Sequence, residues 1–295
     1  MWTEIRLLIK LIPVAMVLSG CATLPWQEEP NATTANQALL PNSEIERALV
    51  ESNAALETGD VETAYAGYSN ILIVVPNHEG ANLGMAECYL AMDRNSDAYD
   101  LFQTVQSSET LKGLSLQGQG LASIKMGKND LARELLFAAS EIDPTLWRSW
   151  NALGQIWDLE ERWELSALAY DNAYRLMPGE AQIANNKGMS QFLQGDLDVA
   201  LKHFEEAVAL DPDLETAVQN RLIILALLGR YDQAVMGIDN VGLPQAFNNV
   251  GYIAMQRGEY KVARSYFTQS LDASATFYPK ADQNLRRVDY LLANE

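Results

Sequence analysis

The sequence predicts an all-α protein, a superhelical solenoid of about seven helix–turn–helix repeats with a C-terminal capping helix. Three observations predict this fold. Prolines recur every 34 residues, small residues recur at two fixed positions of that period, and a large apolar residue recurs at a third. A period of this length is typical of stacked helical hairpins. The chain has 295 residues, of which 48% are apolar, so it can form the long core that such a stack needs.

Residues 1–20 have the order of an export signal. Arg6 and Lys10 are followed by the apolar run Leu11–Leu18, which is too short to cross a bilayer as a helix. The sequence Leu-Ser-Gly-Cys that ends at Cys21 resembles a bacterial lipobox. This resemblance implies that residues 1–20 are removed and that Cys21 is acylated, for example with palmitate. An ordinary signal peptide with an incidental cysteine, or an intracellular protein with an apolar N-terminus, remain alternatives.

The residue after the lipobox is Ala22 rather than aspartate. By resemblance to Gram-negative lipoproteins, this implies an outer-membrane protein that is anchored by lipid only and faces the periplasm. Residues 21–44 are then expected to be the lipidated cysteine and a flexible tether, because Pro25, Pro30 and Pro41 interrupt a stretch without helical periodicity. A random coil of that length spans roughly 25–30 Å.

The 34-residue period covers residues 45–277. Pro144, Pro178 and Pro212 are each 34 residues apart, and Pro76 lies two periods before Pro144. Where a unit has proline near its end, the proline is expected to stop the second helix, and Thr110 takes its place in the second unit, where the boundary is expected to be looser. The seven units begin at Ile45, Glu79, Gly113, Trp147, Ala181, Glu215 and Pro244.

Four positions of the unit carry a recurring residue type. Small residues at positions 8 and 20 allow two helices to approach closely, and a large apolar residue at position 24 fills the groove between them. Glycine at position 15 suits the backbone geometry that ends a helix. Position 20 is Ala64, Ala98, Ala132, Ser166, Ala200, Ala234 and Ala263, and position 24 is Tyr68, Phe102, Leu136, Tyr170, Phe204, Ile238 and Phe267.

The fourth unit resembles the tetratricopeptide repeat closely. The matching residues are Trp150, Leu153, Gly154, Trp157, Tyr170, Ala173 and Pro178. The sixth unit departs from the pattern. Leu222 replaces the small residue at position 8, so its two helices are expected to lie further apart, and five residues are missing after Ile238, where Gly242 and Pro244 interrupt the helix. Residues 278–295 are expected to form an amphipathic helix that covers the end of the stack.

Composition argues against several functions. There are 39 acidic and 21 basic residues, a net charge of −18, so binding to nucleic acid is not expected. His78 and His203 are 125 residues apart and neither has a partner at a metal-binding spacing, so no metal or other cofactor is predicted. Cys88 is expected to be an inert core residue. No pair of carboxylates is set apart as an acid and a base, so the chain is predicted not to be an enzyme.

Amide side chains recur at positions 5 and 6 of the first helices, which line the concave face in tetratricopeptide proteins. An amide both donates and accepts hydrogen bonds, so a regular row could hold the main chain of an extended peptide. Alternatively, the amides bond to neighbouring helices and stiffen the stack. The candidates are Gln117, Asn151, Asn185, Asn186, Gln219, Asn220, Asn248 and Asn249, and the same face offers apolar groups at Met189, Phe192, Ile223 and Met255. Those apolar groups could instead hold the apolar side of a guest helix.

The last third of the chain resembles the tight-adherence (Flp) pilus assembly lipoprotein. The segments that carry this resemblance are Asn248–Tyr252, Gly258–Tyr260, Phe277-Tyr278 and Gln283–Leu285. The resemblance implies a periplasmic scaffold that helps to assemble or locate a secretin, the outer-membrane channel of a pilus or secretion system. An adaptor for cell-wall hydrolases or another envelope complex is the second hypothesis, and an enzyme that uses the acidic groove is the third.

Overall fold

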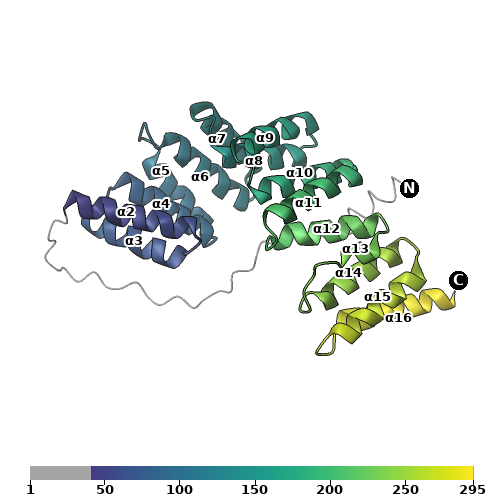
Figure 1. The fold of residues 1–295 in the computed structure, drawn as a ribbon. Helices are drawn as coiled ribbons and strands as arrows, with labels where there is room; N and C mark the ends of the chain where they lie inside the picture. Colours follow the sequence, from purple (N-terminus) through teal and green to yellow (C-terminus); the bar gives the residue numbers. More distant parts are fainter. Residues whose placement is uncertain (1–40, 295) are drawn as a thin grey trace. The chain divides into compact units, whose positions relative to one another are not determined.

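The computed structural model describes residues 41–294. The predicted signal, Cys21 and most of the predicted tether lie outside the described residues. Regular structure in the described residues consists only of α-helices, so the predicted all-α class is confirmed (Figure 1). None of these helices combines the length and apolar character needed to cross a membrane.

The described chain divides into two compact units, one up to Leu135 and one from Leu136 onward. The helices of the first unit are α2 (Asn42–Glu57), α3 (Val61–Val74), α4 (Glu79–Ala91), α5 (Asn95–Val105) and α6 (Lys112–Lys125). Helix α7 (Asn129–Ile142) contains the division. The helices of the second unit are α8 (Trp147–Leu159), α9 (Trp163–Leu176), α10 (Ala181–Gln194), α11 (Leu197–Leu210), α12 (Glu215–Leu227), α13 (Tyr231–Ala234), α14 (Leu243–Gln256), α15 (Tyr260–Ala273) and α16 (Pro279–Ala293).

Consecutive helices pair into hairpins, as the period predicts. In the second unit these hairpins are α8–α9, α10–α11, α12–α13 and α14–α15, and α16 packs on both α14 and α15. The first helices of successive hairpins also contact one another, from α8 through α10, α12 and α14 to α16. This side-by-side row of first helices is the arrangement that a tetratricopeptide stack requires.

The turn inside each hairpin confirms the prediction for position 15. All seven residues there have a positive φ, including the two that are not glycine, Asp93 at 57° and Glu161 at 55°. A residue in the left-handed backbone conformation ends the first helix and turns the chain toward the second. The glycines at the other five positions adopt this conformation without the steric cost that a side chain adds.

Close helix contacts confirm the roles of positions 20 and 24. The small residue at position 20 is fully buried in every unit. In the second unit each ring at position 24 lies on a glycine of its own hairpin, and a Cβ atom at Gly154 would come within 2.5 Å of the Tyr170 ring. In the first unit the ring of Tyr68 instead lies on Gly84 of the following hairpin. The same residue classes therefore support two packing arrangements.

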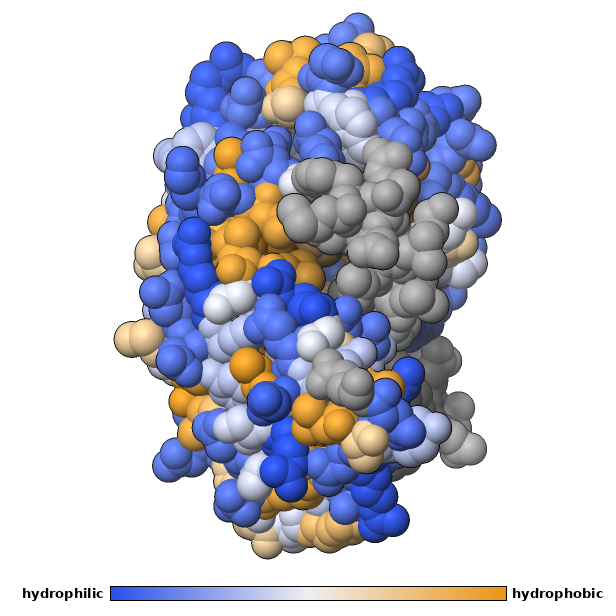
Figure 2. All heavy atoms as spheres, turned by 90° about the vertical axis from the view of Figure 1, so that its right-hand side faces the viewer, coloured by the Kyte–Doolittle hydropathy of each residue, from blue (hydrophilic) through white to orange (hydrophobic). Residues whose placement is uncertain are grey.

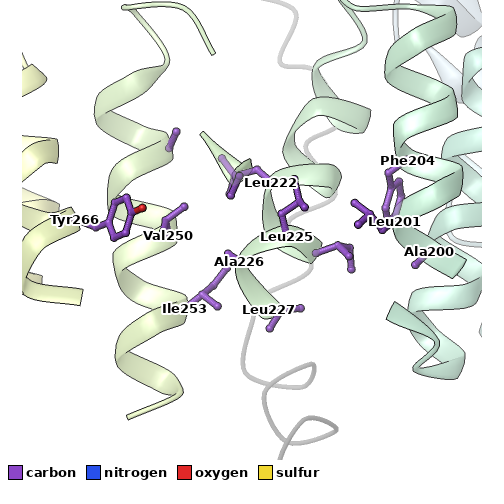
Figure 3. Close-up of a cluster of buried hydrophobic side chains, with 13 residues drawn as sticks. Ala200, Leu201, Phe204, Leu222, Leu225, Ala226, Leu227, Val250, Ile253 and Tyr266 are labelled. Atoms are coloured by element: carbon purple, nitrogen blue, oxygen red, sulfur yellow. The ribbon is translucent and has the colours of Figure 1, made fainter. Parts of the chain in front are cut away.

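The sixth hairpin corrects the sequence prediction. Its second helix, α13, ends at Ala234, four residues before the predicted end at Ile238, and no helix carries position 24. Leu222 is fully buried and lies with Leu225 between Phe204 of α11 and Val250 of α14 (Figure 3). The large residue at position 8 therefore fills the core from the first helix, in the hairpin where the second helix is short.

Two helices begin close to the predicted bounds of the array. Helix α2 begins at Asn42, three residues before the predicted start at Ile45. Pro41 precedes this helix, because its fixed φ and missing N–H suit the position just before a helix. The capping helix begins at Pro279 and buries Ala281 and Val288. The surface seen in Figure 2 is mostly hydrophilic, with hydrophobic patches separated by hydrophilic side chains.

Candidate peptide-binding surface

Three pairs of asparagines connect the first helices of the second unit. Asn186 Nδ2 donates to Asn151 Oδ1 at 3.1 Å, which joins α10 to α8. The corresponding bond from Asn220 to Asn185 is 2.9 Å long and joins α12 to α10. A third bond of 2.9 Å runs from Asn284 to Asn248 and joins α16 to α14. The predicted row of amides therefore exists, and its members bond to one another across the stack.

The pairs follow one rule. The donor is at position 6 of its helix and the acceptor is at position 5 of the preceding first helix, 35 or 36 residues earlier. Asn249 and Gln219 occupy the corresponding positions of α14 and α12, but no side-chain hydrogen bond joins them within residues 41–294. The row is interrupted at the hairpin that has the shortened α13. Gln117 is buried in α6 of the first unit.

The amides differ in how much of each side chain solvent can reach. Asn151 is 7% exposed and Asn248 only 1%, so these two acceptors are covered by their neighbours. Asn185, Asn186, Asn220, Gln219 and Asn249 are half-buried. Because an amide has two N–H groups and an oxygen with two lone pairs, one bond along the row leaves the half-buried amides with further bonding capacity.

The predicted apolar candidates lie beside this row. Met189 and Phe192 of α10 and Ile223 of α12 are half-buried and pack against the core cluster around Leu222. Met255, which the sequence also suggested for this face, is only 5% exposed and is therefore a core residue. The surface thus combines a polar row with the exposed edges of three apolar side chains.

This face of the second unit has one acidic residue, Asp158 at position 12 of α8, which is only 6% exposed. Positions 2, 5, 6 and 9 of α8, α10, α12, α14 and α16, counted from the repeat starts and from Pro279, carry no aspartate or glutamate, although the chain has 39 such residues. The charged residues at these positions are Arg148, Lys280 and Arg287. The row of first helices is therefore neutral to basic on a strongly acidic protein.

A buried polar network under α8 was not predicted. Asp158 is 6% exposed, and its carboxylate accepts hydrogen bonds from Tyr170 at 2.8 Å and from Ser190 at 2.7 Å. These residues belong to α8, α9 and α10. The only sign of this network in the sequence is a polar residue, Asp158, at a position where the repeat is normally apolar. Its two donors could not be identified from the sequence, because they lie 12 and 32 residues away.

The other reactive side chains have local structural roles. His78 accepts a hydrogen bond through Nδ1 from the backbone N–H of Ala81 and so caps α4. His203 lies 3.4 Å from Glu206, and burial lowers the pKa of its imidazole. Burial raises the pKa of the Cys88 thiol to about 11, which keeps it protonated and unreactive at neutral pH. Residues 41–294 contain no group of three histidine, cysteine or acidic side chains placed to hold a metal ion.

Comparison with known proteins identifies the repeat. Tetratricopeptide repeat models match residues 181–214 and residues 244–277, which are the fifth and seventh predicted units. No curated protein matches the sequence.

Solved structures share the fold at low sequence identity. A chain of the APC/C hetero-tetramer Cut9–Hcn1 superposes with a TM-score of 0.59 at 17% identity, over 83% of this chain and 52% of the other. This chain therefore spans about half the length of that protein. A thermophilic tetratricopeptide protein from Thermus thermophilus gives a TM-score of 0.53 at 16% identity, over 65% and 99% of the two chains. A protein from Cytophaga hutchinsonii gives 0.53 at 15%, over 80% and 99%. The chain therefore contains tetratricopeptide repeats and has the fold of tetratricopeptide proteins, which are scaffolds for protein–protein interaction.

Proposed function

We propose that this protein is a lipid-anchored periplasmic scaffold at the outer membrane that holds a segment of a secretin and assists assembly or localisation of the channel. One observation carries the binding part of the proposal. The first helices of the second unit present a row of amides and apolar edges, and positions 2, 5, 6 and 9 of these helices carry no acidic side chain. The lipobox at Cys21 and the resemblance to the Flp pilus lipoprotein support the location and the partner.

The geometry of the row suits an extended guest. Neighbouring packed helices lie roughly 8–10 Å apart, and an extended chain advances about 3.3 Å per residue. A bound segment would therefore meet a new first helix about every third residue. Half-buried amides would bond to its main chain, while Met189, Phe192 and Ile223 would contact its apolar side chains. Because the face is neutral to basic, an uncharged or acidic segment fits better than a basic one.

The partner is tested in the cell that makes the protein. Deleting the gene should reduce the amount of secretin multimer in the outer membrane, measured by electrophoresis without boiling. The wild-type gene should restore it, whereas a Cys21→Ser gene should not, because the lipid anchor is lost. Normal multimers in the deletion strain would refute the secretin role. A cross-linked pull-down that returned cell-wall hydrolases instead would favour the adaptor function.

Binding can be separated from packing because the amides fall into two groups. Gln219 and Asn249 are outside the observed amide pairs, so replacing both by alanine should weaken partner binding about tenfold and change the free energy of unfolding by less than about 0.5 kcal/mol. Replacing Asn186 and Asn220 removes two observed bonds and should destabilise the protein by about 1 kcal/mol for each bond.

The matched control replaces exposed amides on second helices, Gln233 and Gln269. This control should alter neither affinity nor stability. Unchanged partner affinity in the Gln219 and Asn249 double variant would show that the row serves packing alone.

A further inference from the structure

The N-terminal unit contains a groove that the amide row does not reach. Residues of α3, α4 and α5 line it, and α4 packs against both other helices, so α3 and α5 are described below as its two walls. Its volume is about 610 Å³, within the range of sites that hold a ligand or a short segment of a partner. The walls of this groove are second helices of its unit, whereas the amide row lies on first helices of the other unit.

Each wall of the groove presents one helical face. On α3 the lining residues include Tyr65, Leu72 and Ile73, with spacings of seven and eight residues. On α5 they include Asp97, Asp100 and Leu101, spaced three and four residues apart. These spacings place each set on one side of its helix. Ile73 is 61% exposed, which is high for a large apolar side chain at the edge of a groove.

The two walls differ in charge. The α3 wall contributes no charged side chain to the groove, whereas the α5 wall contributes the carboxylates of Asp97 and Asp100. Arg94 is the one basic residue that lines the groove. Its guanidinium lies 4.2 Å from the centre of the Tyr89 ring, and its Nε donates to Asp97 at 2.7 Å. Asp100 is exposed at the groove. The groove therefore has an apolar wall, an acidic wall and a net charge of −1.

We propose that this groove docks a basic amphipathic helix of a partner protein. The apolar stripe of that helix would cover Leu72, Ile73 and Leu101, and a lysine or arginine on its flank would pair with Asp100. Charge complementarity selects this occupant, because an acidic helix would meet two carboxylates on a chain whose net charge is −18. This interaction is independent of the proposed secretin segment, which would be uncharged or acidic and would bind at the amide row of the second unit.

The test uses the purified full chain and a fluorescein-labelled peptide, about 14 residues of leucine and lysine patterned to form an amphipathic helix. Fluorescence anisotropy measures the binding of the peptide. The buffer contains about 0.15 M salt, because salt screens weak attraction between exposed charges. We expect Asp100→Lys and Ile73→Asp each to reduce affinity about tenfold. Two matched controls should change it less than twofold. Glu205→Lys makes the same charge change on exposed α11, and Leu159→Asp replaces a residue that is 62% exposed on α8.

Three results would overturn the proposal. One is equal weakening by Asp100→Lys and Glu205→Lys, which would show general attraction to an acidic chain. Another is equal binding of a peptide with the same composition in scrambled order, since that peptide has no apolar stripe. The third is the absence of measurable binding, or binding that Ile73→Asp leaves unchanged. A circular dichroism spectrum of each variant verifies that α3 and α5 remain folded.

Discussion

Tyr170 donates its phenolic hydroxyl to Oδ2 of Asp158 at 2.8 Å inside the second unit. Ser190 donates to the other carboxylate oxygen at 2.7 Å, so one buried acid connects α8, α9 and α10. Burial, assisted by the neighbouring carboxylate, raises the pKa of Tyr170 well above its usual range. This shift favours the protonated hydroxyl, which is the form that donates to Asp158. This network joins the α8–α9 hairpin to the first helix of the next hairpin.

Removing the tyrosine hydroxyl should destabilise the protein. Tyr170→Phe leaves the buried carboxylate of Asp158 with one donor, and we expect a loss of about 1–3 kcal/mol in the free energy of unfolding. Urea titration followed by circular dichroism measures this loss. Tyr174→Phe is the control, because Tyr174 donates to Glu206 at the protein surface and its loss should cost less than about 0.5 kcal/mol. Equal losses in the two variants would contradict a special role for the buried network.

Gly188→Ala should also destabilise the protein, although alanine is normally the better helix former. A Cβ atom at Gly188 would lie 2.7 Å from the Phe204 ring, so the ring and the two helices must move apart. We expect a net loss of about 1–3 kcal/mol, as for other overpacked cores. Gly179→Ala should change stability by less than about 0.5 kcal/mol, because nothing lies within 4 Å of the added atom. Thermal unfolding of the two variants compares them directly.

Replacing Glu161 by glycine should stabilise the fourth hairpin. Glu161 has a φ of 55°, which costs a residue with a side chain about 1–2 kcal/mol. Glycine avoids this strain but loses more backbone entropy on folding, so a net gain of up to about 1 kcal/mol is expected. Glu164→Gly, in the first turn of α9, should instead cost about 1 kcal/mol. A loss of stability in the Glu161 variant would show that its side chain has contacts worth more than the strain.

His203 should make stability depend on pH. Burial is the largest influence and lowers its pKa in the folded protein, the interaction with Glu206 opposes this, and Lys187 adds to the lowering, so the net shift is downward. The unfolded chain therefore binds the proton more readily, and stability should fall as the pH drops below about 6.5. His203→Gln should reduce this fall between about pH 8 and pH 5, measured by urea unfolding at several pH values. Identical pH profiles for the variant and the wild type would contradict the assignment.

The row of amides was partly predictable. Identical residue types at positions 5 and 6 of successive units indicated that Asn151, Asn185, Asn186 and Asn220 share one face. Their spacing did not reveal which amide donates to which, or that Asn248 is almost fully buried. Those outcomes depend on how far each helix is displaced from the one before it. That displacement is set by packing between residues about 35 positions apart.

The order of helices, the tight turn at position 15 and the small residue at position 20 could be read from the sequence alone. These features depend on local backbone geometry and on side-chain size, which the residue type determines. The tertiary structure alone decided that Tyr68 packs on the next hairpin while Tyr170 packs on its own. It also decided that Leu222 fills the core beside the shortened α13, and that α3, α4 and α5 line one groove. Each of these outcomes depends on the relative positions of neighbouring helices, and many side chains determine those positions together.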